Sequence, residues 1–129
     1  MGNPVVWFEV LGRDGKALRK FYRDLFRWRI SDGNPNNAVD YGLVDAEDDG
    51  IAGGIGASPT RRRSFATFVV EVKNPEAIVA RAERLGGKTV VPLANVPGLE
   101  MQKAYIEDPD GNLICITRGM SNPSLSDHE

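Results

Sequence analysis

The sequence is poor in the residues that most often carry catalysis and bind metals. Its 129 residues include one cysteine, Cys115, and one histidine, His128. A single histidine beside the C-terminal residue cannot build a His-based triad, nor a metal site of two histidines and a carboxylate. One cysteine cannot form an intrachain disulfide. A chain without disulfides suits a reducing compartment, so the sequence predicts a cytoplasmic protein.

A strong charge and a long apolar segment are also missing. The net charge of -2 gives no reason to expect nucleic acid or an anionic membrane as a partner. No apolar run approaches the roughly 18 residues of a membrane helix. The start, "MGNPVVWFEV", lacks the basic residues and apolar run of a signal peptide. The hydrophobic content of 41% is ordinary for a globular protein, and the length suits one domain.

Secondary-structure signals come in two similar sets, and the first set occupies the N-terminal half. "VVWFEV" has the β-branched and aromatic content of a strand. The segment "GRDGKALRKFYRDLFRW" predicts a helix with Asp14 as N-cap, an apolar stripe, and Arg19 on the polar side. The apolar stripe consists of Leu18, Phe21, Tyr22 and Leu25. "RWRI", "AVDYGLV" and the glycine-rich "IAGGIG" are then typical of three short strands.

The second set repeats this order. "ATFVVEV" predicts a strand, and "NPEAIVARAERLGG" predicts a helix with Asn74 as N-cap, Pro75 at its start and two glycines at its end. "KTVVPL", "LEMQKAYIE" and "LICIT" follow as strands, with a tight turn in "DPDGN". The sequence thus predicts one α+β domain over residues 4–118, made of two βαβββ modules at 4–58 and 64–118, and a flexible tail at 119–129.

Alternation along the strands separates two faces of the predicted sheet. In the first strand, Val6, Phe8 and Val10 form an apolar set that we expect to lie under the helix. The other set is mixed in character and faces the opposite side. If that side encloses a cavity, its candidate lining residues are Trp7, Glu9, Thr67, Glu71, Tyr105 and Cys115.

The paired βαβββ modules, "FYRDLFRW", "ARAERLGG" and "DPDGN" together resemble the vicinal oxygen chelate superfamily. This superfamily includes glyoxalase I, the bleomycin-resistance proteins and the extradiol dioxygenases. The resemblance implies that the modules form a curved mixed sheet with a ligand-binding cleft, and that the protein is a homodimer. It also implies a metal in some members, held by a histidine on the first strand and a glutamate on the last strand of a module.

Those ligand positions carry other residues in this chain. The resemblance places the histidines at Trp7 or Val5 and at Val69 or Thr67, and the glutamates at Gly53 or Gly54 and at Cys115. A single thiol without a histidine partner is a poor site for zinc, iron or manganese. We therefore predict no metal and no cofactor.

Three of the candidate residue types have two interpretations each. Trp7 can stack on a flat ligand or pack the module interface, and the sequence does not decide between them. Cys115 can be a reactive thiol or a small apolar filler, and the filler is favoured because no base is near in the sequence. Glu9 and Glu71 can share a proton across a cleft or form structural ion pairs, and the ion pairs are favoured.

Three functions remain open at this point. The preferred one is a dimer that binds a small organic molecule between its modules without catalysis, as in the drug-resistance branch. The second is a lyase or oxidoreductase of the glyoxalase or dioxygenase kind, with an unusual ligand set drawn from Glu9, Glu71 or Glu100. The third is a non-catalytic interaction module. The sequence names no ligand.

Overall fold

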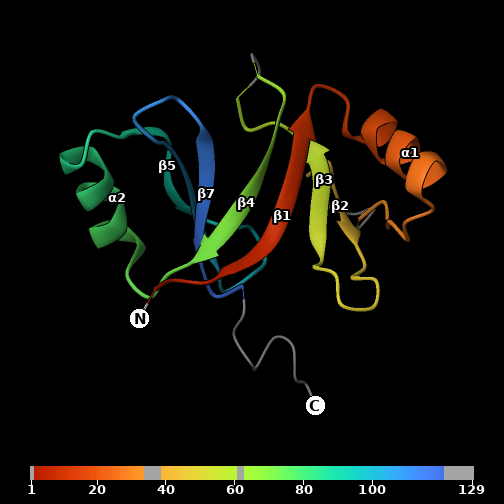
Figure 1. Ribbon diagram of the computed structural model, residues 1–129, viewed down its shortest axis with the longest axis horizontal. Helices are drawn as coiled ribbons and strands as arrows, with labels where there is room; N and C mark the ends of the chain where they lie inside the picture. The colour runs from red at the N-terminus through yellow and green to blue at the C-terminus, as the bar shows by residue number, and fades with distance from the viewer. Residues whose placement is uncertain (1, 34–38, 61–62, 121–129) are drawn as a thin grey trace. The chain divides into compact units, whose positions relative to one another are not determined.

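The computed structural model describes residues 2–33, 39–60 and 63–120. These residues form an α+β fold, which confirms the predicted class (Figure 1). Its elements, in chain order, are β1 (Val5–Gly12), α1 (Gly15–Phe26), β2 (Tyr41–Val44), β3 (Gly53–Ala57), β4 (Phe65–Glu71), α2 (Pro75–Arg84), β5 (Lys88–Asn95), β6 (Gln102–Glu107) and β7 (Leu113–Arg118). The predicted tail lies outside the described residues from position 121 on.

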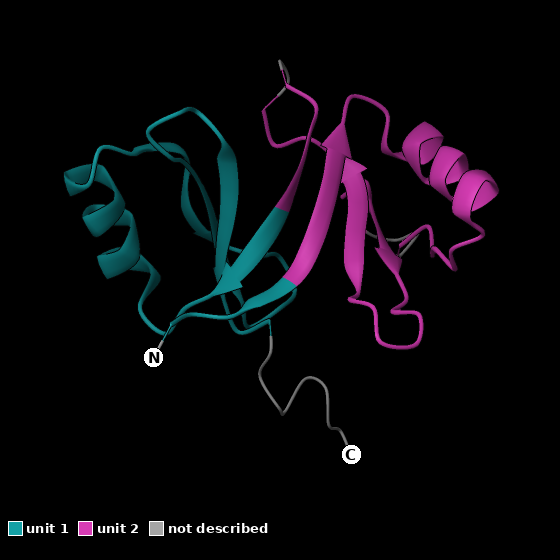
Figure 2. Cartoon of the chain, viewed as in Figure 1, with its two compact units in different colours: residues 1–6, 68–129 teal, residues 7–67 magenta. Residues whose placement is uncertain are grey.

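Two compact units make up the fold (Figure 2). The N-terminal unit comprises residues 7–67, and the C-terminal unit comprises residues 2–6 together with the residues from 68 on. In the N-terminal unit, β1 runs parallel to β3, and β3 pairs antiparallel with β2. In the C-terminal unit, β4 runs parallel to β7, which pairs antiparallel with β6, and β6 with β5. The strand before α1 therefore lies beside β3, and the strand before α2 lies beside β7.

Both helices begin at the predicted caps. The Asp14 side chain accepts a hydrogen bond from the backbone N–H of Ala17 at 3.0 Å, and the Asn74 side chain accepts one from Ala77 at 3.1 Å. These bonds satisfy backbone donors that a helix leaves open at its first turn. After α2, Gly86 has a φ of 98°, the left-handed conformation that ends many helices.

One predicted strand is nearly absent. The segment from Arg27 to Ile30 was expected to form a strand, but only Ile30 pairs, as an isolated bridge to Val44. The reason is local: Arg27 caps α1 with a φ of 59°, so the chain turns sharply directly after the helix. Regular pairing is therefore confined to the end of the segment.

The core of the N-terminal unit lies between α1 and its strands. Ile30, Val44 and Ile55 are buried there, and partly buried apolar residues pack against them: Phe8, Val10, Leu18, Tyr22 and Trp28. Phe8 and Val10 thus face α1, as the alternation along β1 predicts. The other face of β1, which carries Trp7 and Glu9, is turned away from the helix.

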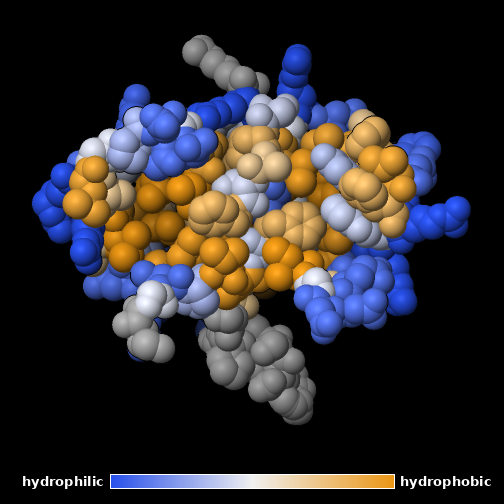
Figure 3. Space-filling view, viewed as in Figure 1, coloured by the Kyte–Doolittle hydropathy of each residue, from blue (hydrophilic) through white to orange (hydrophobic). Residues whose placement is uncertain are grey.

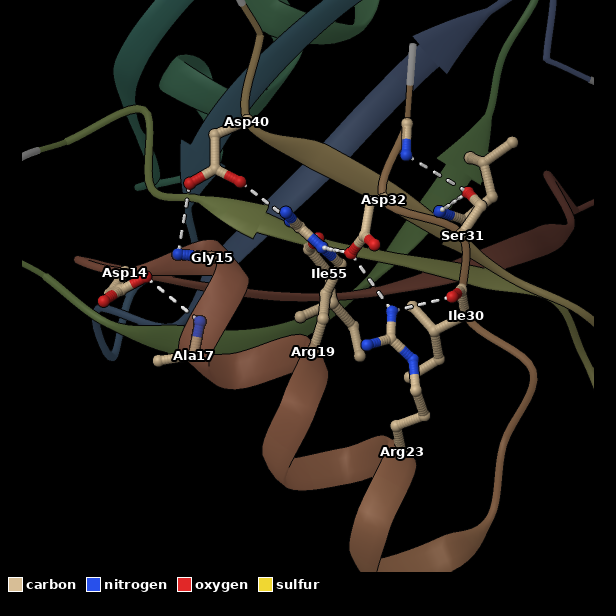
Figure 4. Close-up of polar contacts among 12 residues, drawn as sticks. Asp14, Gly15, Ala17, Arg19, Arg23, Ile30, Ser31, Asp32, Asp40 and Ile55 are labelled. Atoms are coloured by element: carbon tan, nitrogen blue, oxygen red, sulfur yellow. Dashed lines mark hydrogen bonds and ion pairs between the residues drawn. The ribbon is translucent and has the colours of Figure 1, made fainter. Parts of the chain in front are cut away.

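The prediction for the polar side of α1 was wrong at one residue. Arg19 is only 4% exposed, and its guanidinium lies 2.7 Å from Asp40 and 3.3 Å from Asp32 (Figure 4). It also donates to the backbone carbonyl of Ile55 at 3.0 Å. A side chain at Gly42 would collide with Arg19, so the glycine provides the space for this buried cation.

The predicted apolar stripe of α1 is only half buried. Leu18 and Tyr22 pack on the core, whereas Phe21 is 56% exposed and Leu25 is 55% exposed. Figure 3 shows this apolar surface in orange over α1, at the right of the view. Arg19 takes part of the buried side of α1, whereas Phe21 and Leu25 face outward.

The "DPDGN" motif is a hydrogen-bonded turn between β6 and β7. Asp108 accepts hydrogen bonds from the backbone N–H groups of Asp110 and Asn112, each at 2.9 Å, and from the Asn112 side chain at 2.8 Å. These bonds hold the pKa of Asp108 below its ordinary value of 3.8. Gly111 has a φ of 88°, which few other residues adopt readily. The motif thus sets the direction in which β7 begins.

Neither described helix has the length and hydrophobicity that crossing a lipid bilayer requires.

Candidate functional site

The N-terminal unit brings two of the predicted residues together on the face of β1 that is turned away from α1. Glu9 is paired in register with Gly54 of β3, so both lie on this face. Trp7 is two residues before Glu9 and shares its side of the strand. The predicted placement of Trp7 and Glu9 on one face is therefore found in the structure.

A chain of hydrogen bonds connects these residues through Tyr41. The indole Nε1 of Trp7 donates to the Tyr41 hydroxyl at 2.8 Å, and that hydroxyl donates to Glu9 Oε2 at 2.8 Å. Glu9 is fully buried, whereas Trp7 and Tyr41 are half-buried. The carboxyl group therefore fixes the tyrosine, and the two aromatic side chains are the partly exposed members of this hydrogen-bond chain.

Glycines in β3 decide where Tyr41 can lie. A Cβ atom at Gly54 would fall on the Tyr41 hydroxyl and ring, and one at Gly53 would fall on the ring of Phe8. Gly53 thus belongs to the helix side, and Gly54 to the side of Glu9. Of the two positions at which the resemblance left the first-module glutamate open, Gly54 is the one on the face of Trp7 and Glu9.

In the C-terminal unit, Cys115 is a fully buried residue of β7. Its neighbours in register are Val69 of β4 on one side and Tyr105 of β6 on the other. Both neighbours are also buried, with exposed fractions of 0% and 4%. This burial is consistent with the interpretation of Cys115 as an apolar filler, since a reactive thiol needs exposure.

Glu71 and Thr67 occupy other parts of β4. The Glu71 carboxylate accepts the backbone N–H of Gly119 at 2.9 Å and of Met120 at 3.1 Å. These two bonds attach the chain that leaves β7 to the β4 strand. Thr67 is half-buried near the start of the strand. Glu100, named with the alternative ligand set, is exposed in the connection between β5 and β6.

The residues at the metal positions of the resemblance do not fit a metal ion. Trp7 has an indole N–H, which only donates hydrogen bonds, and Gly54 has no side chain. The Tyr41 ring covers the position where a longer side chain at 54 would point. Across residues 2–33, 39–60 and 63–120, no three His, Cys, Asp or Glu side chains gather in a way that could hold a metal.

Tyr41 is the residue whose role the sequence reveals least. The strand pattern gives its face but not its contact with Glu9, which is 32 residues away in the chain. The glycines of "IAGGIG" are the usable signal, because glycine in a strand indicates close approach of another group. Here the group that approaches Gly54 is the tyrosine ring.

Comparisons with known proteins agree with this fold. The family model of the Glyoxalase/Bleomycin resistance protein/Dioxygenase superfamily matches residues 5–116. A solved structure of a superfamily member from Vibrio splendidus 12B01 has 17% sequence identity and a TM-score of 0.58, with 91% of this chain and 99% of that chain covered. A sequence comparison with curated proteins finds no significant match.

Methylmalonyl-CoA epimerases also share the fold. The enzyme from Mycobacterium tuberculosis is 13% identical with a TM-score of 0.60, and the match covers 95% of this chain and 91% of that chain. A variant of the Streptomyces coelicolor enzyme, in complex with 2-nitronate-propionyl-CoA, is 12% identical with a TM-score of 0.58, covering 92% and 96%. At such identities the likeness concerns the fold alone.

Proposed function

The chain belongs to the glyoxalase/bleomycin resistance protein/dioxygenase superfamily, and from this membership we propose that it binds a small organic molecule without a bound metal ion. The binding surface in this proposal is the face of the N-terminal unit that carries Trp7 and Tyr41. Binding rather than turnover is its principal activity.

The observation that carries the proposal is the chain of hydrogen bonds from Trp7 through Tyr41 to Glu9. It stands where metal-dependent relatives would present ligand atoms, and it fixes two aromatic rings in one arrangement. Rings that are held in advance lose little conformational freedom when a ligand binds. A flat or apolar molecule is the class that such rings accommodate best.

No fitting set of metal ligands gathers within the described residues, and this supports the metal-free part of the proposal. Replacing a metal ligand by Trp7 introduces a bulky ring that donates through its N–H and offers no lone pair to a cation. Glu9, the carboxyl group nearest to that position in the sequence, accepts a hydrogen bond from Tyr41. The proposal therefore assigns Glu9 a positioning role.

The test is ligand-induced thermal stabilisation of chelator-treated protein. The panel contains aromatic antibiotics, aromatic metabolites and acyl-CoA thioesters, the last because a structure of similar fold holds 2-nitronate-propionyl-CoA. A ligand that binds only the folded state raises the melting temperature by mass action. We expect at least one aromatic compound to do so without added metal.

A matched pair of variants tests on which face of the N-terminal unit the ligand binds. Tyr41→Phe removes the hydroxyl that connects Trp7 to Glu9, and Tyr22→Phe removes the same atom from a tyrosine of α1 on the other face. We expect Tyr41→Phe to weaken binding about tenfold, the effect of roughly 1.4 kcal/mol, and Tyr22→Phe to leave it unchanged. The proposal would be contradicted if no compound in the panel raised the melting temperature, or if both variants weakened binding equally.

A further inference from the structure

A hollow lies on the side of the N-terminal unit opposite to Trp7 and Glu9, at the end of β2 and the start of β3. It has a volume of about 340 Å³. Small-molecule sites in proteins typically span about 300–1,000 Å³, so it has room for a small ligand. Four apolar residues line it, Phe8, Trp28, Val44 and Ile51, together with Asp45 and Glu47. Phe8, Trp28 and Val44 belong to the core that faces α1, so this hollow is separate from the face of Trp7.

Contacts with aromatic side chains of β1 and α1 hold Trp28 in the wall of this hollow. Phe8 and Trp28 have ring centroids 5.8 Å apart and a tilt of 58°. Trp28 also stacks on Tyr22 of α1, at 5.7 Å and 9°. Gly53 permits the Phe8 position, because any Cβ there would meet its ring. The indole is therefore fixed before any ligand arrives.

Two carboxylates stand at the rim of the apolar wall. Asp45 and Glu47 are exposed and come from the connection between β2 and β3. Salt bridges among the described residues join Arg19, Lys20 and Arg23 to other aspartates, and none of them involves Asp45 or Glu47. The hollow has no basic lining residue in the described part of the chain. Negative charge beside an aromatic face favours a cation.

We propose that this hollow binds a small organic amine in its protonated form. The apolar body of the amine lies against Phe8, Trp28 and Ile51, and the ammonium group meets Asp45 and Glu47. Anions are excluded by the same two carboxylates. A neutral analogue of equal shape gains only the apolar part of the interaction. This site does not depend on the ligand proposed for the face of Trp7.

Phenethylamine, phenethyl alcohol and phenylacetate test the proposal, because they differ mainly in charge. The chain has two tryptophans, so a ¹H–¹⁵N spectrum of the full chain contains two indole N–H signals. The signal that disappears in Trp7→Phe belongs to Trp7, and the remaining signal belongs to Trp28. We expect phenethylamine to shift the Trp28 signal saturably, with the Trp7 signal unmoved. The alcohol should bind at least about tenfold more weakly, which corresponds to about 1.4 kcal/mol, and phenylacetate should cause no shift.

Two charge-neutralising double variants distinguish binding in the hollow from a general attraction of the amine to the negative charge of the loop. Asp45→Asn with Glu47→Gln removes the rim charges, while Asp48→Asn with Asp49→Asn removes two charges from the same loop outside the hollow. We expect the first pair to weaken phenethylamine about tenfold or more and the second pair to change affinity less than twofold. Equal weakening by both pairs, equal binding of the alcohol, or a shift at Trp7 alone would overturn the proposal.

Discussion

The missing side chain of Gly54 determines the arrangement on the face of β1 that carries Trp7 and Glu9. Gly54 leaves space for the Tyr41 ring, and that ring connects Trp7 to Glu9. The sequence predicted that Trp7 and Glu9 share a face because alternation in a strand is a local property. The tyrosine contact depends on strand pairing between distant segments, which no local pattern encodes.

We predict that Gly54→Ala destabilises the protein by about 1–3 kcal/mol, the usual cost of inserting an atom into a packed site. The added methyl group would fall on the Tyr41 side chain, which must then move. Urea unfolding of wild type and variant measures the difference. In a Tyr41→Ala background the ring is gone, so the same glycine substitution should cost less. Additive costs in this double-mutant cycle would contradict the contact.

Cys115 is predicted to be a structural residue. Cys115→Ser places a hydroxyl between Val69 and Tyr105 in a fully buried position, and it should cost about 1–3 kcal/mol in unfolding free energy. A thiol reagent should label the wild-type protein only as fast as the protein unfolds. Rapid labelling of the native protein, with Cys115→Ser as stable as wild type, would mean that the thiol is accessible and reactive.

Among the elements, α1 shows what periodicity can and cannot predict. Its start at Asp14 followed from capping chemistry, which acts within one turn. Its buried face followed only in part, because a buried Arg19 is possible only where the fold supplies Asp40 and the carbonyl of Ile55. Those partners lie 21 and 36 residues further along the chain. The hydrophobic pattern therefore identifies the helix but only part of the face that it buries.

We predict that Arg19→Lys destabilises the fold by about 1–3 kcal/mol, although it keeps the charge. Lysine cannot reproduce the forked geometry with which Arg19 contacts Asp32, Asp40 and the Ile55 carbonyl. Arg13→Lys is the matched control at an exposed position, where we expect a change within about 0.5 kcal/mol. Chemical denaturation of both variants measures the effect, and equal stabilities would exclude a special role for Arg19.

The turn between β6 and β7 makes stability sensitive to acid. The folded-state pKa of Asp108 is lowered, chiefly by the hydrogen bond from the Asn112 side chain. The charged form therefore stabilises the fold above the ordinary pKa of 3.8, and this contribution is lost as pH falls through the lower folded value. We expect the stability gap between wild type and Asp108→Asn to narrow in acid below about pH 4. The Asp110→Asn control should show no such narrowing, since in this turn the contact of Asp110 with Asp108 is through its backbone N–H.

For the whole molecule, the repeated order of elements was the strongest signal in the sequence. Capping residues, strand alternation and the "DPDGN" turn are all local, and each recurs in the structure close to its expected place. The strand expected near Ile30 was the exception. The left-handed conformation of Arg27 turns the chain after α1, so only a single bridge forms at Ile30. Family membership followed from the order of these signals, whereas the ligand depends on side chains that vary within the fold.

We propose that this protein binds its ligand without a metal ion. The direct measurement is calorimetric titration of the stabilising compound into chelator-treated protein, then into protein with added zinc, nickel, manganese or ferrous iron, with elemental analysis of the purified sample. We predict the same dissociation constant in every case and no stoichiometric metal. Stoichiometric metal in the purified protein, whose removal abolishes binding and whose return restores it, would rule out metal-free binding.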